Sequence, residues 1–202
     1  GAIVDLETGE QLMSCTLSPE KAVELLEITR EFDVMADPYI GGRAVTEERC
    51  MARLHHYGLS EAMQTMVHDT RDVVSDVVEY VGQVGKGVEK INIFFADIAD
   101  RAPLRCRLER ESGIAITAAM VNNLELNDEN ATKGNGLMWL ADYLGVDREA
   151  TMAIGDGEND VSMIRMAGVG VAMDNALDLV KQYADEITLT NDEDGVAAVI
   201  ER

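Results

Sequence analysis

The stretch AIGDGEND, residues Ala153–Asp160, places three acidic side chains and one amide where an apolar run meets the start of a helical pattern. The preceding residues are β-prone, so they predict a buried strand that ends near Gly155. Glycines at 155 and 157 permit a tight turn. Ligands of parallel α/β sheets bind at the carboxyl ends of the strands. The stretch therefore predicts a ligand site with Asp156 at the strand tip.

Hard oxygen atoms on a strand tip suit Mg²⁺, which takes one or two carboxylates and completes its shell with water and phosphate oxygens. Asn159 and Asp160 fall in the first turn of the next helix. A structural interpretation stays open, because Asp and Asn are ordinary helix caps and Gly-Asp-Gly is an ordinary turn. An EF-hand fits poorly, since its sixth loop position, counted from Asp156, holds Val161 rather than glycine.

Lys133 begins another helical pattern, in the run ATKG at residues 131–134. A cation is locally unfavourable at a helix N-terminus, where the dipole end is positive. An anion bound by Lys133 explains its position, and a solvated surface lysine is the alternative.

The composition narrows the class of protein. The chain has 202 residues, a formal net charge of −21 and 47% hydrophobic residues. Such acidity disfavours nucleic-acid binding. Three scattered cysteines without a Cys-x-x-Cys pair favour free thiols in a reducing cytoplasm and argue against zinc. No apolar run is long enough to span a membrane. We therefore expect a cytoplasmic protein with no nucleic-acid or membrane partner.

Helical and strand patterns alternate from Lys133 onward, which predicts βαβ units and a parallel sheet. The middle of the chain mixes paired strands with helices. We expect residues 1–16 and 120–202 to form one domain of α/β class, and residues 17–119 to form an inserted α+β cap. Within the cap, helical patterns are expected from Thr46 to Gly58 and from Ser60 to about Tyr80. Arg43, in a Gly-Gly-Arg loop, is a candidate for holding a second anionic group, with a solvated arginine as the alternative.

Four segments together carry a family resemblance: Lys133-Gly134, GDGEND, the run AGVGVAMDNA at 167–176, and NDEDGVA at 191–197. This set resembles the Cof-type subfamily (IIB) of the haloacid dehalogenase (HAD) superfamily, whose members are mostly Mg²⁺-dependent phosphatases of small phosphorylated metabolites. The resemblance is close over about 122–202 and loose over 17–120. It implies a HAD-like Rossmannoid parallel sheet with an inserted cap.

The resemblance also implies roles for single residues. Asp156 would bind Mg²⁺ directly, and Asp160 would support the metal from its outer shell. Asn159 would contact the substrate or the metal-bound phosphate. Lys133 would neutralise the phosphoryl group and orient the nucleophile.

The family's nucleophile and general acid/base are two aspartates in a DxDGT motif after the first strand. Asp5 and Glu7, in IVDLETG, are a poor match, because Thr and Gly stand in the opposite order and a β-rich run follows as in a hairpin. We therefore expect a chain that lacks the N-terminal strand–helix–strand, exposes sheet edges that favour self-association, and does not turn over substrate alone.

Three functions remain in view. The first is a HAD-type phosphatase of small metabolites, with sugar phosphates as the default substrate. The second is a catalytically silent module that binds Mg²⁺ or phosphate, or that oligomerises. The third is a phosphomutase or other phosphotransferase on the same fold. A DxDGT-like stretch in preceding coding sequence would favour an enzyme over the silent module.

Overall fold

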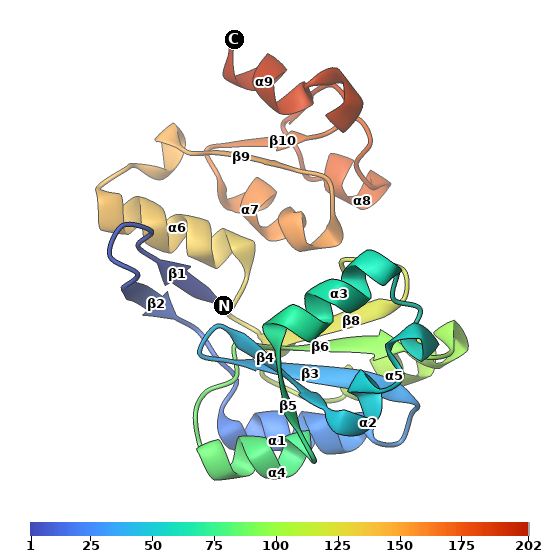
Figure 1. The fold of residues 1–202 in the computed structure, drawn as a ribbon. Coiled ribbons are helices and arrows are strands. Elements are labelled where there is room, and N and C mark those ends of the chain that lie inside the picture. The colour runs from blue at the N-terminus through green and yellow to red at the C-terminus, as the bar shows by residue number, and fades with distance from the viewer. Residues whose placement is uncertain (202) are drawn as a thin grey trace. The chain divides into compact units, whose positions relative to one another are not determined.

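The computed structural model describes residues 1–201, which fall into two compact units. Unit 1 contains residues 1–2 and 13–130, and unit 2 contains residues 3–12 and 131–201. An N-terminal hairpin of β1 (Ala2–Val4) and β2 (Gln11–Ser14) is divided between them. The hairpin predicted from the sequence is thus present (Figure 1).

Unit 1 is built on a six-stranded sheet in the order β5-β4-β3-β6-β8-β7. The pairs are antiparallel except β4 with β5, which run parallel. The strands are β3 (Val34–Ile40), β4 (Arg43–Glu47), β5 (Arg71–Val74), β6 (Lys90–Phe95), β7 (Ile114–Thr117) and β8 (Asn123–Asp128).

Two groups of helices cover this sheet. One face carries α1 (Pro19–Thr29), α4 (Val77–Val84) and α5 (Arg101–Leu108), and the short turn η2 (Ile98–Asp100) leads into α5. The other face carries α2 (Glu48–Met51), η1 (Leu54–Tyr57) and α3 (Glu61–Thr70). The helix α1 begins at Pro19 because Ser18 Oγ accepts the Lys21 N–H at 3.1 Å and proline suits the first helical position.

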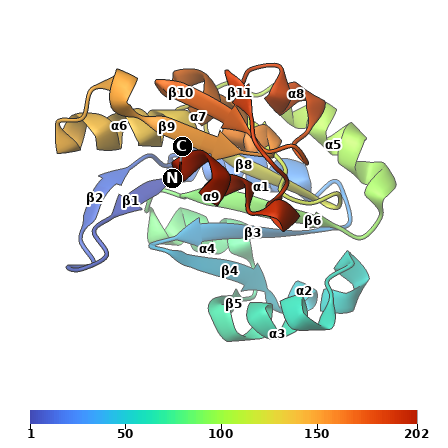
Figure 2. The same ribbon diagram turned by 90° about the horizontal axis from the view of Figure 1, so that it is seen from above.

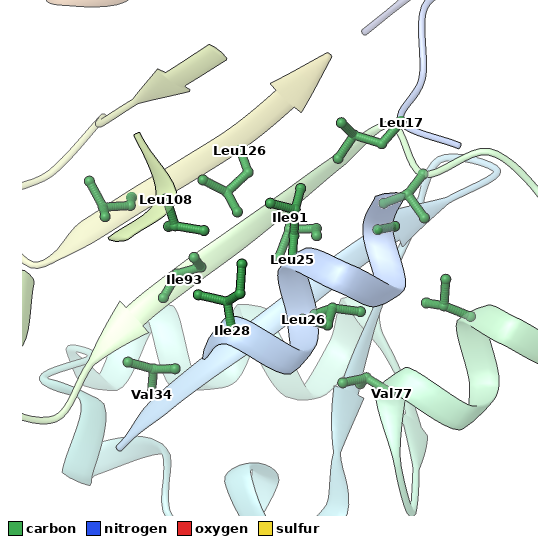
Figure 3. Packing of buried hydrophobic residues seen from close by; sticks show 14 of the residues in the cluster. Leu17, Leu25, Leu26, Ile28, Val34, Val77, Ile91, Ile93, Leu108 and Leu126 are labelled. Carbon is green, nitrogen blue, oxygen red and sulfur yellow. The ribbon is translucent and has the colours of Figure 1, made fainter. Parts of the chain in front are cut away.

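The alternation of side chains along β6 produces both cores of unit 1. Ile91 and Ile93 point toward α1, where Leu25 and Leu26 are fully buried (Figure 3). Phe94 points to the opposite face and packs in a second cluster with residues of α2, η1 and α3. Burial of this strand on both faces accounts for the largely apolar run INIFF in the sequence.

Unit 2 contains a three-stranded parallel sheet in the order β11-β10-β9. The strands are β9 (Met152–Gly155), β10 (Val169–Ala172) and β11 (Glu186–Ile187). The helices and turns are α6 (Lys133–Leu144), η3 (Arg148–Ala150), η4 (Glu158–Asp160), α7 (Val161–Met166), α8 (Asp178–Lys181), η5 (Asn191–Glu193) and α9 (Gly195–Ile200). Figures 1 and 2 show this α/β arrangement, and the predicted parallel sheet is confirmed.

The structure corrects three details of the sequence interpretation. The strand β8 pairs with β6 and β7, so unit 1 extends to residue 130 rather than to 119. The helix expected from Thr46 to Gly58 is reduced to α2 and η1, because residues 43–47 form β4. The helix expected from Ser60 to Tyr80 is interrupted by β5, which pairs with β4 over four residues.

A buried aspartate joins three strands of unit 1. Asp37 of β3 is fully buried, accepts a hydrogen bond from Thr46 Oγ1 of β4, and pairs with Arg71 Nε of β5 at 3.2 Å. Burial raises the pKa of the Asp37 carboxyl to about 6, against the opposing effect of Thr46 and Arg71. Between pH 4 and 6 the folded chain therefore keeps a proton that the unfolded chain has released.

This difference makes Asp37 a pH-dependent element of stability. Folding stability falls with rising pH wherever the folded state binds more protons, so Asp37 should cost about 2 kcal/mol between pH 4.5 and 7.5. Urea denaturation measures the free energy of unfolding of the wild type and of Asp37→Asn at both pH values. From pH 4.5 to 7.5, the free energy of unfolding of the wild type should fall relative to that of Asp37→Asn. Asp72→Asn, which changes a half-exposed side chain of β5, serves as the control and should show no such drop. An unchanged difference for Asp37→Asn would contradict the prediction.

Within residues 1–201 no helix has both the length and the apolar character needed to cross a membrane. Cys15, Cys50 and Cys106 are all free thiols, as their spacing predicts.

Candidate functional site

The AIGDGEND stretch forms a closed loop between β9 and α7. The strand ends at Gly155, and η4 carries Asp160 as its last residue. Asp160 is only 5% exposed, and its Oδ2 accepts the backbone N–H groups of Asp156 and Gly157, each at 3.0 Å. One carboxylate oxygen therefore fixes the backbone on which Asp156 is mounted.

Gly155 is required by the close approach of Asp160. A Cβ atom placed on Gly155 would lie 2.4 Å from Asp160 Cβ and 2.6 Å from its Cγ. Both distances are far below van der Waals contact, so any larger residue would displace the Asp160 carboxylate. The glycine that the sequence suggests for turn geometry thus serves chiefly to make room for a side chain.

Lys133 reaches the same carboxylate from α6. The helix begins there because Thr132 Oγ1 accepts the Asn135 N–H at 3.1 Å. Lys133 Nζ donates to Asp160 Oδ1, and the lysine side chain remains 47% exposed. Asp160 is thus an anion within the chain that pairs with Lys133, and the lysine side chain still remains partly accessible to solvent.

The contact of α6 with α7 makes this ion pair possible. The Gly134 N–H donates to Ser162 Oγ at 3.0 Å, and a Cβ on Gly134 would lie 2.6 Å from the Ser162 carbonyl oxygen. A glycine next to Lys133 therefore lets the start of α6 approach the start of α7. Ser162 received no role from the sequence, since nothing in its local pattern marks a partner 28 residues earlier.

The ionisation of Asp160 follows from these contacts. Burial alone would raise the pKa of its carboxyl, but hydrogen bonds from Lys133 and from the Gly157 and Asp156 N–H groups outweigh burial. The pKa of Asp160 is therefore lower than its usual value. At neutral pH the side chain is a carboxylate, with Oδ1 bound to the ammonium group and Oδ2 bound to the two backbone N–H groups.

Asp156 differs from Asp160 in being exposed at the carboxyl end of β9. Its backbone carbonyl accepts the Leu177 N–H at 3.1 Å, and its Oδ2 accepts a long hydrogen bond of 3.4 Å from Asn175 Nδ2. Its carboxylate can therefore accept a ligand from solvent.

The carboxylates of this loop fit the Mg²⁺ ion that the family resemblance implies. Asp156 offers accessible oxygens, whereas both oxygens of Asp160 are engaged, which fits an outer-shell role. Across residues 1–201 no cluster of three or more His, Cys, Asp or Glu side chains could hold a metal. Mg²⁺ commonly takes one or two carboxylates and fills its shell with water and substrate phosphate. One carboxylate from this chain fits that pattern.

The other two candidate residues lie in different places. Asn159 is half-buried in η4, and a Cβ on Gly157 would lie 2.8 Å from its Oδ1, so its amide folds over the loop beside Asp156. Arg43 belongs to β4 of unit 1, where Asp72 accepts from its Nε at 3.0 Å and its Nη2 at 2.8 Å. Asp72 already balances its charge, and a substrate role for Arg43 stays a prediction.

The hairpin aspartate is engaged within its own turn. Asp5 Oδ1 accepts the N–H groups of Glu7 at 2.9 Å and Thr8 at 2.8 Å, and the Asp5 N–H donates to the Glu10 carbonyl at 2.8 Å. These are the contacts of a structural turn aspartate.

Comparison with known proteins places this chain in a family. The model of the haloacid dehalogenase-like hydrolase family matches residues 1–200. A putative phosphatase of Haemophilus influenzae is 29% identical over 217 residues, covering 100% of this chain and 72% of the relative. The chloroplastic endoribonuclease YBEY of Arabidopsis thaliana is 31% identical over 163 residues, which cover 79% of this chain but only 27% of that protein.

Among solved structures, a haloacid dehalogenase-like hydrolase from Bacteroides thetaiotaomicron superposes with a TM-score of 0.78 at 33% identity, covering 100% of this chain and 73% of the other. The fold and the site define a HAD-like α/β protein, and the chain belongs to the haloacid dehalogenase-like hydrolase family. The Cof-type resemblance predicted from the motifs is confirmed.

Proposed function

We propose that this protein is a Mg²⁺-dependent phosphatase of small phosphorylated metabolites, and that sugar phosphates are its substrates. The observation that carries the proposal is the pairing of an accessible carboxylate, Asp156, with an ammonium group, Lys133, through the buried Asp160. A carboxylate for a divalent cation next to a cation for a phosphoryl group is what phosphoryl transfer requires. The name of the Haemophilus relative, a putative phosphatase, supports the same reaction class.

Each residue has a defined task in this proposal. Asp156 would hold Mg²⁺, which when bound supplies positive charge to the phosphoryl oxygens. Asp160 keeps the loop backbone fixed, so that Asp156 needs little rearrangement when the ion arrives. Lys133 donates to the phosphoryl group with the N–H bonds that Asp160 leaves unused. Asn159 contacts the bound phosphate from the middle of η4.

The proposal also limits what residues 1–202 do alone. A HAD-type reaction forms an aspartyl-phosphate, which requires a free nucleophilic carboxylate. The candidate Asp5 has one carboxylate oxygen, Oδ1, engaged by two backbone N–H groups of its own turn. This supports a chain that provides the metal- and phosphate-binding part of the site and has no turnover by itself.

The test separates binding from turnover. We expect the purified 202-residue chain to bind inorganic phosphate in the presence of Mg²⁺, and to hydrolyse p-nitrophenyl phosphate no faster than its Asp156→Asn variant. Mg²⁺-dependent hydrolysis that Asp156→Asn abolishes would overturn the predicted inactivity while supporting a phosphatase. If phosphate binds equally well without Mg²⁺ and in the Lys133→Ala variant, the proposed site is wrong.

The class of reaction is tested with the product of the whole gene. Release of inorganic phosphate from a panel of sugar phosphates, lost in Asp156→Asn, would support the phosphatase. Transfer of the phosphoryl group to a second sugar would support a phosphotransferase. Tight Mg²⁺ and phosphate binding without any reaction would support a silent binding module.

A further inference from the structure

The segment that follows β10 carries an asparagine whose backbone is fixed independently of its side chain. The Met173 N–H donates to the Gly155 carbonyl at 3.0 Å, and the Leu177 N–H donates to the Asp156 carbonyl at 3.1 Å. The Asp174 N–H donates to the Leu189 carbonyl at 3.3 Å. These backbone bonds place Asn175 between the Asp156 loop and the loop that begins η5.

The amide of Asn175 bridges the two loops. Its Oδ1 accepts the backbone N–H of Asn191 at 3.0 Å, and its Nδ2 donates to Asp156 Oδ2 at 3.4 Å. A backbone N–H can only donate, so the Asn191 contact determines which end of the amide faces Asp156. The NH₂ group is thereby aimed at the carboxylate, and the amide oxygen faces the Asn191 N–H instead.

We propose that Asn175 is a positioning residue for the Mg²⁺ site. It binds one oxygen of the Asp156 carboxylate and leaves the other oxygen to face the ion. Asn191 acts through its backbone N–H, which holds the Asn175 amide in the required orientation. This inference rests on the proposed role of Asp156 as a Mg²⁺ ligand. Partners that orient a metal ligand typically contribute 10–100-fold to metal affinity.

The backbone donor gives a sharp pair of variants. Asn191→Ala keeps the N–H group and should leave the bridge intact. Asn191→Pro removes the N–H group, and proline is tolerated because residue 191 is the first residue of η5. The preceding Thr190 has φ −70° and ψ 168°, an extended conformation that suits a residue before proline. The two variants therefore differ in the hydrogen bond from the residue 191 N–H to Asn175 Oδ1.

The test measures the dissociation constant of MgCl₂ by isothermal titration calorimetry on the full chain. Asn175→Ala should weaken binding about tenfold, and Asn191→Pro should weaken it at least about threefold. Asn191→Ala should bind as the wild type does. In proton–nitrogen spectra, the side-chain NH₂ resonances of Asn175 should move when Mg²⁺ is added. Circular dichroism in EDTA should show all three variants folded.

The outcomes distinguish this inference from the proposed function. If the wild type binds Mg²⁺, Asp156→Asn loses binding and Asn175→Ala stays within twofold of the wild type, the positioning role is wrong and the metal site stands. Equal weakening by Asn191→Ala and Asn191→Pro would also overturn it. If the wild type shows no Mg²⁺ binding that depends on Asp156, the proposed function fails first.

Discussion

Replacing Asp156 with asparagine should weaken Mg²⁺ binding about a hundredfold, equivalent to about 2.7 kcal/mol. Asparagine preserves the size of the side chain and the backbone N–H that Asp160 accepts. It removes the negative charge of the accessible carboxylate at the tip of β9. A hard divalent cation binds mainly through its attraction to such a charge. Titration calorimetry with MgCl₂ measures the change directly.

Asp174→Asn provides the matched control for this prediction. Asp174 lies on the neighbouring segment, and its Oδ1 is paired with Lys181 Nζ at 3.2 Å. Removal of its charge should change Mg²⁺ affinity by less than about threefold, since exposed charges interact weakly through water. Similar losses in the two variants would indicate that Mg²⁺ responds to the overall acidity of the chain, and not to a site at Asp156.

Replacing Asp160 with alanine should lower the free energy of unfolding by about 3 kcal/mol in EDTA. Truncation leaves the Asp156 and Gly157 N–H groups without their acceptor and Lys133 without its counter-ion. Removing one partner of a buried, hydrogen-bonded charge is strongly destabilising, whereas an exposed ion pair contributes little. Asp174→Ala breaks the exposed pair with Lys181 and should cost less than about 1 kcal/mol.

The same comparison has a defined pH dependence. Because the folded chain holds the pKa of Asp160 below that of the unfolded chain, its contribution is present above the unfolded value, near pH 4. It should be lost as the pH falls through the lower folded value. Urea denaturation should show that the difference in free energy of unfolding between the wild type and Asp160→Ala becomes smaller below pH 4. If Asp160→Ala and Asp174→Ala lose similar amounts of unfolding free energy at pH 7, the structural role of Asp160 is contradicted.

Local signals were sufficient for the helix that carries Lys133. Thr132 is a strong N-cap, so the helix begins at Lys133 as the sequence predicts, and Gly145 adopts the left-handed conformation that ends it. The GDGEND loop followed from its glycines and its place after an apolar strand. In both places the determining interactions lie within a few residues of one another, which is why the sequence alone revealed them.

Long-range pairing explains what the sequence interpretation missed. The strand β5 is four residues long and lies between two helices, so its residues fell inside the helical pattern expected from Ser60 to about Tyr80. In the structure Val73 is 47% exposed on β5, whereas Val77 and Val81 are buried on α4. The strand exists because β4 pairs with it, and no local pattern reports a partner about 27 residues away.

The same limit applies to the candidate site. Lys133 and Asp160 were each singled out, but their ion pair depends on the packing of α6 against α7 through Gly134 and Ser162. Asn175 lay inside a recognised motif and still received no role, because its partners are Asp156 and a backbone N–H at residue 191. Side chains that act on another side chain became visible only with the fold.

A crystal structure of the chain soaked with MgCl₂ and orthovanadate would test the central claim most directly. We expect an ion roughly 2.1 Å from a carboxylate oxygen of Asp156, with a vanadate oxygen within hydrogen-bond distance of Lys133 Nζ and Asp160 still bound to the Asp156 and Gly157 N–H groups. An ion held elsewhere, or vanadate bound with no ion at Asp156, would contradict the claim that these residues form a divalent-cation and phosphoryl site.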